Sequence, residues 1–226
     1  MGWSSRSPVV RGLVFGLAAY LLGYFVAFLL AGPAVADRVS GAMVPYAGTN
    51  LPIAEVSDGP VSPATAAGWL LYSGHLVPVA AAAFPVSDGS LGNLALTGGP
   101  RALAALAVPP VALTAGGWAV AAPVATPRPG LRTARVSLSG LGREVRVPVA
   151  GLRGTALLVG YLPAAYAGCL VFSIGESGGA LPTVGPDMVL GVAVAGLAYP
   201  IVFGAFGGLL AGLWASRRAS ARPLRS

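Results

Sequence analysis

The chain of 226 residues is strongly apolar: 55% of its residues are hydrophobic, only 9% are charged, and the mean hydropathy is +0.77. About a quarter of the residues in a soluble domain are charged, so this composition excludes an ordinary soluble protein. The formal net charge of +7 rests on fourteen Arg and no Lys. Most of these Arg flank apolar segments, which is typical of a membrane protein and argues against a nucleic-acid-binding face.

Five apolar segments follow one another along the chain. A helix that crosses a hydrocarbon core about 30 Å thick needs roughly 20 apolar residues, because each residue rises about 1.5 Å. The segments that meet or approach this length are 9–31, 64–84, 102–124, 154–175 and 187–216. We therefore expect an all-α integral membrane protein, a bundle of five hydrophobic helices that forms a single membrane domain over residues 1–226.

The first segment, 9–31, is preceded by Arg6 and ends before Gly32 and Pro33. The tripeptide Ala-Val-Ala at 34–36 resembles a signal-peptidase site, so cleavage of residues 1–36 is the alternative to a retained helix. The apolar stretch is long for a signal peptide, which favours the retained helix.

The second segment, 64–84, is the most polar of the five and holds Trp69, Tyr72 and His75 at intervals of three residues. These three residues follow one side of a helix. A titratable residue inside a span is by default a functional candidate, and Tyr72 is a candidate hydrogen-bond partner for His75. The plainer interpretation, which we favour, is a neutral imidazole bonded to a neighbouring helix. A full crossing is expected, with a re-entrant or surface helix as the alternative.

Between the third and fourth segments lies a basic loop, 125–153, with six Arg. Polar and apolar residues alternate on both sides of residues 139–142, which predicts a small basic β-hairpin outside the bilayer. A basic tail, 217–226, follows the last segment.

The last segment begins after Pro186 and Asp187 and carries a stripe of small residues at steps of four: Gly196, Pro200, Gly204, Gly208 and Gly212. Such a stripe lets a second helix approach closely in lipid, so we expect these five positions to pack against another helix.

The positive-inside rule assigns the Arg-rich regions to the cytoplasm. With five crossings, loop 125–153 and the C-terminus are cytoplasmic and the N-terminus lies outside. With a re-entrant second segment, both termini and the loop are cytoplasmic. Arg counts favour neither version clearly.

Three stretches stand out when they are taken together: Gly68-Trp-Leu-Leu-Tyr-Ser-Gly-His-Leu-Val77, Val159-Gly-Tyr-Leu-Pro163, and Pro186-Asp187 followed by Gly196-Leu-Ala-Tyr-Pro-Ile-Val-Phe-Gly-Ala-Phe-Gly-Gly208. They resemble an uncharacterised family of multi-span membrane proteins from halophilic archaea. In that family the middle of the first stretch usually resembles Tyr-Asn/Ser-Ala-His-Phe-Val. Here His75 matches, whereas Gly74 and Leu76 depart from the pattern. The resemblance implies no known activity, cofactor or catalytic residue.

These observations favour a structural or accessory component of the cell membrane, multi-pass, with no enzymatic activity and no cofactor. The expected partners are the lipid bilayer and a membrane protein or a second copy of the chain, and no nucleic acid. The alternative is a small-solute transporter or channel subunit, because prolines break every apolar segment except the first and broken helices form midplane sites in transporters. That alternative would use His75.

Overall fold

The computed structural model describes residues 7–46, 49–82, 89–125, 146–175 and 183–220. The predicted hairpin around 139–142 and the tail residues 221–226 lie outside this part of the chain.

The chain forms two compact units. Unit 1 consists of Met1–Ala19, Val111–Tyr161 and Tyr199–Ser226, and unit 2 consists of Tyr20–Pro110 and Leu162–Ala198. Each unit therefore combines segments that are distant in the sequence.

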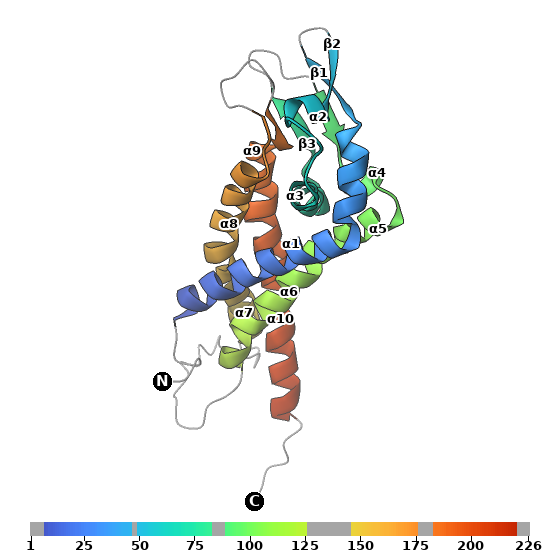
Figure 1. The fold of residues 1–226 in the computed structure, drawn as a ribbon. Coiled ribbons are helices and arrows are strands. Elements are labelled where there is room, and N and C mark those ends of the chain that lie inside the picture. Colours follow the sequence, from blue (N-terminus) through green and yellow to red (C-terminus); the bar gives the residue numbers. More distant parts are fainter. Residues whose placement is uncertain (1–6, 47–48, 83–88, 126–145, 176–182, 221–226) are drawn as a thin grey trace, which may run out of the picture. The chain divides into compact units, whose positions relative to one another are not determined.

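Within the described residues, four helical runs are long and apolar enough to cross a membrane (Figure 1). They cover Pro8–Ser40, Pro100–Ala122, Val147–Val171 and Met188–Arg217. The first, third, fourth and fifth predicted segments thus correspond to candidate spans, and the prediction of five spanning helices is wrong at the second segment.

The first run is a single helix, α1 (Pro8–Ser40), which passes through Pro33 and continues beyond the predicted end of the segment. Its last turns contribute Val35 and Val39 to the core, both almost fully buried. Burial of these side chains offsets the cost of the hydrogen bond that Pro33 cannot make.

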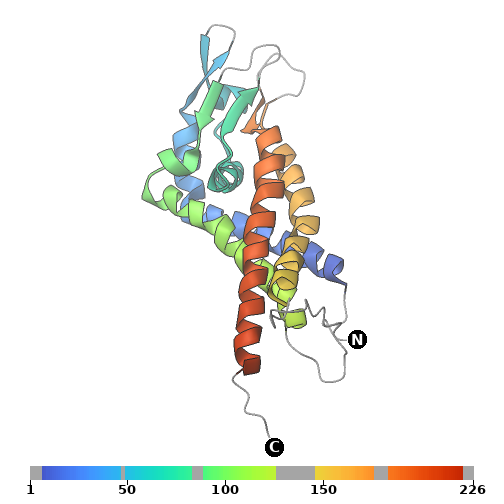
Figure 2. The same cartoon turned by 180° about the vertical axis from the view of Figure 1, so that it is seen from behind.

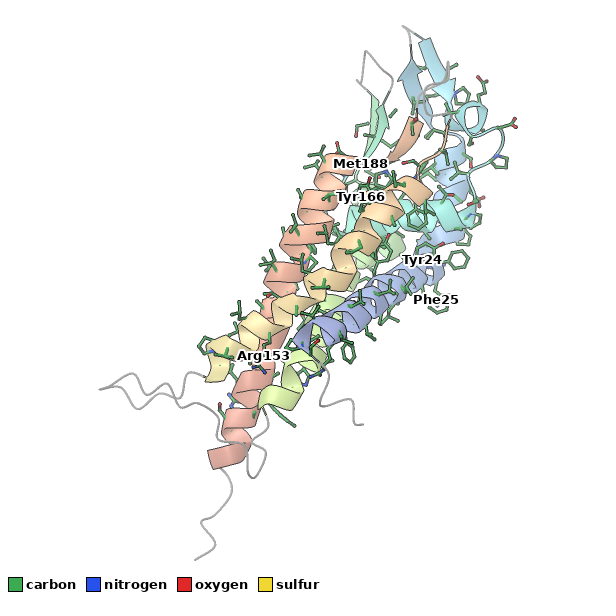
Figure 3. All side chains as sticks on the ribbon, turned by 90° about the vertical axis from the view of Figure 1, so that its left-hand side faces the viewer. Tyr24, Phe25, Arg153, Tyr166 and Met188 are labelled. Atoms are coloured by element: carbon green, nitrogen blue, oxygen red, sulfur yellow. The ribbon has the colours of Figure 1, made fainter. Side chains whose placement is uncertain are left out.

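The two faces of α1 differ in a way that is unusual for a soluble protein. Its buried face carries mostly small residues, among them Gly12, Gly16, Gly23 and Ala27, together with Arg11 and Tyr20. Its exposed face is a stripe of large apolar residues at steps of four: Leu13, Leu17, Leu21, Phe25 and Leu29. Figure 3 shows Phe25, which is 56% exposed, projecting from the helix.

The second predicted span, 64–84, does not form a spanning helix. Its helical part is α3 (Pro63–Gly74), whose 12 residues extend only about 18 Å. The chain then turns and enters a strand, β3 (Val79–Ala82). The expected full crossing is contradicted by this chain reversal.

A Schellman motif ends α3. Leu76 donates its backbone N–H to Ser73 and Val77 donates to Tyr72, at 3.0 Å each. Leu76 occupies the left-handed position with φ 64°, which glycine normally fills, and Pro78 follows two residues later. The apolar contact that accompanies this motif is present, because Val77 packs in one cluster with Tyr72.

Short strands correct the expectation of an all-α fold. A hairpin joins β1 (Met43–Tyr46) to β2 (Thr49–Pro52), and α2 (Ile53–Val56) follows it. A second antiparallel sheet has the order β4-β3-β5, with β4 at Gly89–Gly92 and β5 at Thr183–Pro186. These strands lie outside the long helices. Their pairing satisfies the backbone N–H and C=O groups that would otherwise have no hydrogen-bond partner.

The remaining spans are interrupted helices. The second run joins α5 (Pro100–Leu103), the 3₁₀ turn η2 (Ala104–Ala107) and α6 (Val108–Ala125), and is preceded by α4 (Leu94–Thr97). The third run joins α7 (Arg146–Gly154), the 3₁₀ turn η3 (Thr155–Leu157) and α8 (Leu158–Val171). The predicted basic loop 125–153 therefore ends in helix, because residues from Arg146 onward form α7.

The last run joins α9 (Met188–Leu190), a π-helix η4 (Gly191–Ala198) and α10 (Tyr199–Ser220). The Asp187 carboxylate accepts the Leu190 N–H at 2.8 Å and so caps the start of the run. Pro200 lacks the N–H that an α-helix would direct to Gly196, which favours a different hydrogen-bond register in the preceding turns.

Unit 1 is packed around close backbone approaches. α7 lies along α10, and glycines of both helices face each other (Figure 1). Unit 2 is packed around α3, whose residues from Ala66 to Gly74 are all buried. The helix contacts β3, β5, α4 and η2, and in Figure 2 it is seen nearly end-on beneath the strands.

Candidate functional site

The start of α3 is fixed by local sequence. Ser62 is the N-cap, and its Oγ accepts the Thr65 N–H at 3.0 Å. Pro63 occupies the first helical turn, where a missing N–H costs nothing. The Ser-Pro start and the Schellman motif at the end set the 12-residue length of α3. This short helix places the side chains described below in the interior of unit 2.

Trp69, Tyr72 and His75, the three sequence-predicted residues, are all buried, with 0%, 1% and 1% of their surfaces exposed. Each donates to a backbone carbonyl. Trp69 Nε1–H donates to Phe172 at 2.6 Å, and His75 Nδ1–H donates to Leu71 at 2.8 Å. The three side chains therefore bind to different parts of unit 2 and do not converge on one ligand position.

Tyr72 is the centre of the buried polar cluster. Its hydroxyl donates to the Ala165 carbonyl of α8 and lies 3.2 Å from the Tyr20 hydroxyl of α1. Because the single Tyr72 proton is directed to Ala165, Tyr20 is the donor in the tyrosine pair. Burial raises the pKa of Tyr72, so the hydroxyl stays protonated. Through this one oxygen, α3 is bonded to both α1 and α8.

His75 is held as a neutral imidazole. Burial lowers its pKa to about 4, and the hydrogen bond to Leu71 opposes that shift only in part. The rings of Tyr72 and His75 lie side by side, with centroids 6.4 Å apart. The predicted Tyr72–His75 partnership is thus a ring contact, since the Tyr72 hydroxyl binds Ala165 and Tyr20.

Sequence reasoning missed Cys169 and Asn93 as parts of this cluster. Cys169 of α8 packs against Tyr72, and Gly191 of η4 leaves the space that its sulfur fills. Asn93 caps α4 and also donates to the Ser73 carbonyl at 2.8 Å, which satisfies the end of α3. An Asn before an apolar run is an N-cap signal, but its second bond depends on the tertiary fold.

The cluster carries no arrangement for metal chemistry within the described residues. No three His, Cys, Asp or Glu side chains there come close enough to hold a metal ion. Every buried side-chain nitrogen or oxygen in that part of the chain has a hydrogen-bond partner. The arrangement shown can position helices, and its donors are engaged inside the protein.

The five stripe positions of the last run are all buried. In unit 1, a Cβ on Gly208 would overlap the Ala150 carbonyl oxygen of α7, and one on Gly204 would lie 2.7 Å from the Gly154 oxygen. Gly212 faces Val147 in the same way, and Pro200 is also buried. In unit 2, a Cβ on Gly196 would lie 2.7 Å from Leu162.

Unit 1 contains a buried polar contact that the sequence analysis did not predict. Arg11 of α1 is 7% exposed, and its Nη2 donates to the Ala119 carbonyl of α6. The residue four positions after Ala119 is Pro123, which has no N–H to offer that carbonyl. Arg11 thus supplies the donor that the proline removes.

The comparisons with known proteins identify a family for this chain but assign no activity to it. No curated protein and no solved structure matches the chain. The matching family is described as a family of unknown function, DUF7978, and the match covers residues 2–215. The expectation of an uncharacterised family is thereby confirmed, and this chain belongs to that family of unknown function.

Proposed function

We propose that this chain is an integral membrane protein that crosses the bilayer four times. The surface of α1 carries the proposal, because its stripe of Leu and Phe side chains is exposed and most of its buried positions are Gly or Ala. In water the large apolar side chains would be buried, whereas in lipid they face the hydrocarbon tails and small residues let helices approach closely. The same division recurs on α10, where Val202 and Phe206 are exposed and Gly204 and Gly208 are buried.

We further propose that both termini and residues 126–145 are cytoplasmic and that the membrane is the cell membrane. Four crossings put these three regions on one side. Unit 1 contains twelve of the fourteen Arg and one of the seven acidic residues, and the positive-inside rule directs such regions to the cytoplasm. Origin in a halophilic archaeon stays a prediction from the sequence resemblance.

The proposed role is that of a structural or accessory membrane component, without enzymatic activity and without a cofactor. The observation that supports it is the internal use of the polar side chains of α3 and of its C-cap: Trp69, Tyr72 and His75 all donate to backbone carbonyls of unit 2. A catalytic or transport site needs polar groups free to meet a substrate. The proposed partners are lipid and a membrane protein or second copy, and no nucleic acid.

The alternative function is a small-solute transporter or channel subunit. It is supported by the short buried helix α3 and by the prolines inside the long runs, since interrupted helices form binding sites in transporters. In that case His75 would have to exchange its internal hydrogen bond for one to the solute.

A flux assay separates the two functions. The purified chain is reconstituted into liposomes, and uptake of small ions and neutral solutes is compared with protein-free liposomes. The accessory role predicts no flux above the protein-free level for any solute. Flux that is lost in His75→Ala and retained in Tyr166→Phe, a change on the exposed part of α8, would instead establish the transport function.

A further inference from the structure

The long helical runs share a feature at the boundary between the two compact units. Each run passes from one unit to the other, and the boundaries fall at 19/20, 110/111, 161/162 and 198/199. At three of the four boundaries a proline lies within two residues: Pro110, Pro163 and Pro200. A proline removes one helical hydrogen bond and its ring crowds the carbonyl four residues earlier, which makes a helix bend more easily at that point.

The same three runs also leave the α-helical register upstream of the proline, two residues before Pro200, three before Pro110 and six before Pro163. The 3₁₀ turn η2 precedes Pro110, the 3₁₀ turn η3 precedes Pro163, and the π-helix η4 precedes Pro200. Such turns have poorer or differently spaced hydrogen bonds than an α-helix, and in the middle of a helix they often mark a hinge. A proline and a change of hydrogen-bond register therefore lie near one boundary in each of three runs.

The interior of each unit, by contrast, is tightly packed. In unit 1 the approach of Gly154 to Gly204 and of Ala150 to Gly208 leaves no room for a methyl group. In unit 2 the Tyr72 hydroxyl bonds α3 to α1 and α8. Closely packed interiors of this kind move as rigid bodies and do not deform continuously.

We propose that the two units are rigid bodies that rotate relative to one another about a hinge at Pro110, Pro163 and Pro200. α1 crosses the boundary as uninterrupted α-helix and follows by gentle bending. The hinge goes beyond the proposed function and is compatible with either an accessory component or a transporter, so its failure would leave both open.

Distance measurements between spin labels test the proposal on the full-length chain in lipid nanodiscs. Labels are attached to cysteines in a Cys169→Ser background at exposed positions. The pair Leu96→Cys with Leu213→Cys spans the two units, Leu96→Cys with Val171→Cys reports on unit 2, and Leu152→Cys with Leu213→Cys reports on unit 1. The spanning pair is expected to give a distance distribution at least about twofold broader than the two internal pairs.

Proline replacement then locates the hinge. Pro200→Ala restores an N–H and is expected to narrow the spanning distribution, while the internal pairs stay narrow and report that both units remain folded. Pro33→Ala is the matched control, because Pro33 lies within α1 inside unit 2 and away from the boundary. A spanning distribution as narrow as the internal ones would overturn the proposal. So would equal distributions in Pro200→Ala, Pro33→Ala and the parent chain.

Discussion

The Tyr72 hydroxyl joins α3 to two other helices of unit 2, α1 and α8. Tyr72→Phe removes the donor to Ala165 and the acceptor for Tyr20 while keeping the ring in place. Leaving buried polar groups unpaired costs about 1–3 kcal/mol, so the free energy of unfolding should fall by that amount. Denaturant titration in detergent micelles measures it. Tyr166→Phe, which changes a hydroxyl at a half-exposed position, should stay within about 0.5 kcal/mol of the parent.

His75 should make the stability of the protein depend on pH. Burial lowers its pKa from 6.5 to about 4, so the unfolded chain binds a proton more readily than the folded chain. The stabilisation is complete above about pH 6.5 and declines as the pH falls toward 4, to a total loss on the order of 3 kcal/mol. Unfolding measured from pH 7.5 to pH 4 checks this. The same series on His75→Gln should show a smaller slope between pH 6.5 and pH 4, and an unchanged slope would contradict the assignment.

Arg11 and Pro123 should be energetically coupled. Arg11→Met keeps much of the apolar length but leaves the Ala119 carbonyl without its donor, at a cost of about 1–3 kcal/mol. Pro123→Ala supplies a backbone N–H to the same carbonyl, so Arg11→Met should cost less in a Pro123→Ala background. A double-mutant cycle on unfolding free energies measures the coupling, and strict additivity of the two changes would show that Arg11 does not serve this carbonyl.

Small residues decide how closely helices α7 and α10 pack. Gly208→Ala places a methyl group against the backbone of Ala150 and should destabilise unit 1 by about 1–3 kcal/mol, since backbone cannot move aside cheaply. Gly41→Ala is the matched control, because a Cβ there meets nothing within 4 Å. Thermal unfolding in detergent compares the two variants. Equal midpoints would mean that the close approach of α7 and α10 contributes nothing to stability.

The end of α3 shows how a helix can stop inside an apolar segment. Hydropathy alone favours continuation from 64 to 84, because nothing charged interrupts it. The Schellman hydrogen bonds at Leu76 and the pairing of β3 with two strands satisfy the backbone beyond Gly74 in another way. Pro78 is visible in the sequence, but proline kinks some membrane helices and ends others. The sequence alone therefore could not decide whether the helix continues past Pro78.

The number of membrane crossings decides on which side of the bilayer each terminus lies. Reporter fusions at the N-terminus, at the C-terminus and in the turn at Asp58 test the four-crossing arrangement. Both termini should read cytoplasmic and the turn external, because unit 1 carries the Arg-rich regions. An external N-terminus with a cytoplasmic C-terminus would require a fifth crossing and contradict the proposal.

Hydropathy, helix caps and periodicity are local properties, so they predicted the strongly apolar character of the chain and four of its long apolar helices. They also drew attention to Trp69, Tyr72 and His75 and to the small-residue stripe of the last run. Long-range packing settled the rest: the second segment turns back, the Tyr72 hydroxyl meets Tyr20 and Ala165, and Arg11 reaches Ala119. These features depend on contacts between residues up to 108 positions apart, and local sequence patterns carry no information about which distant group completes a hydrogen bond.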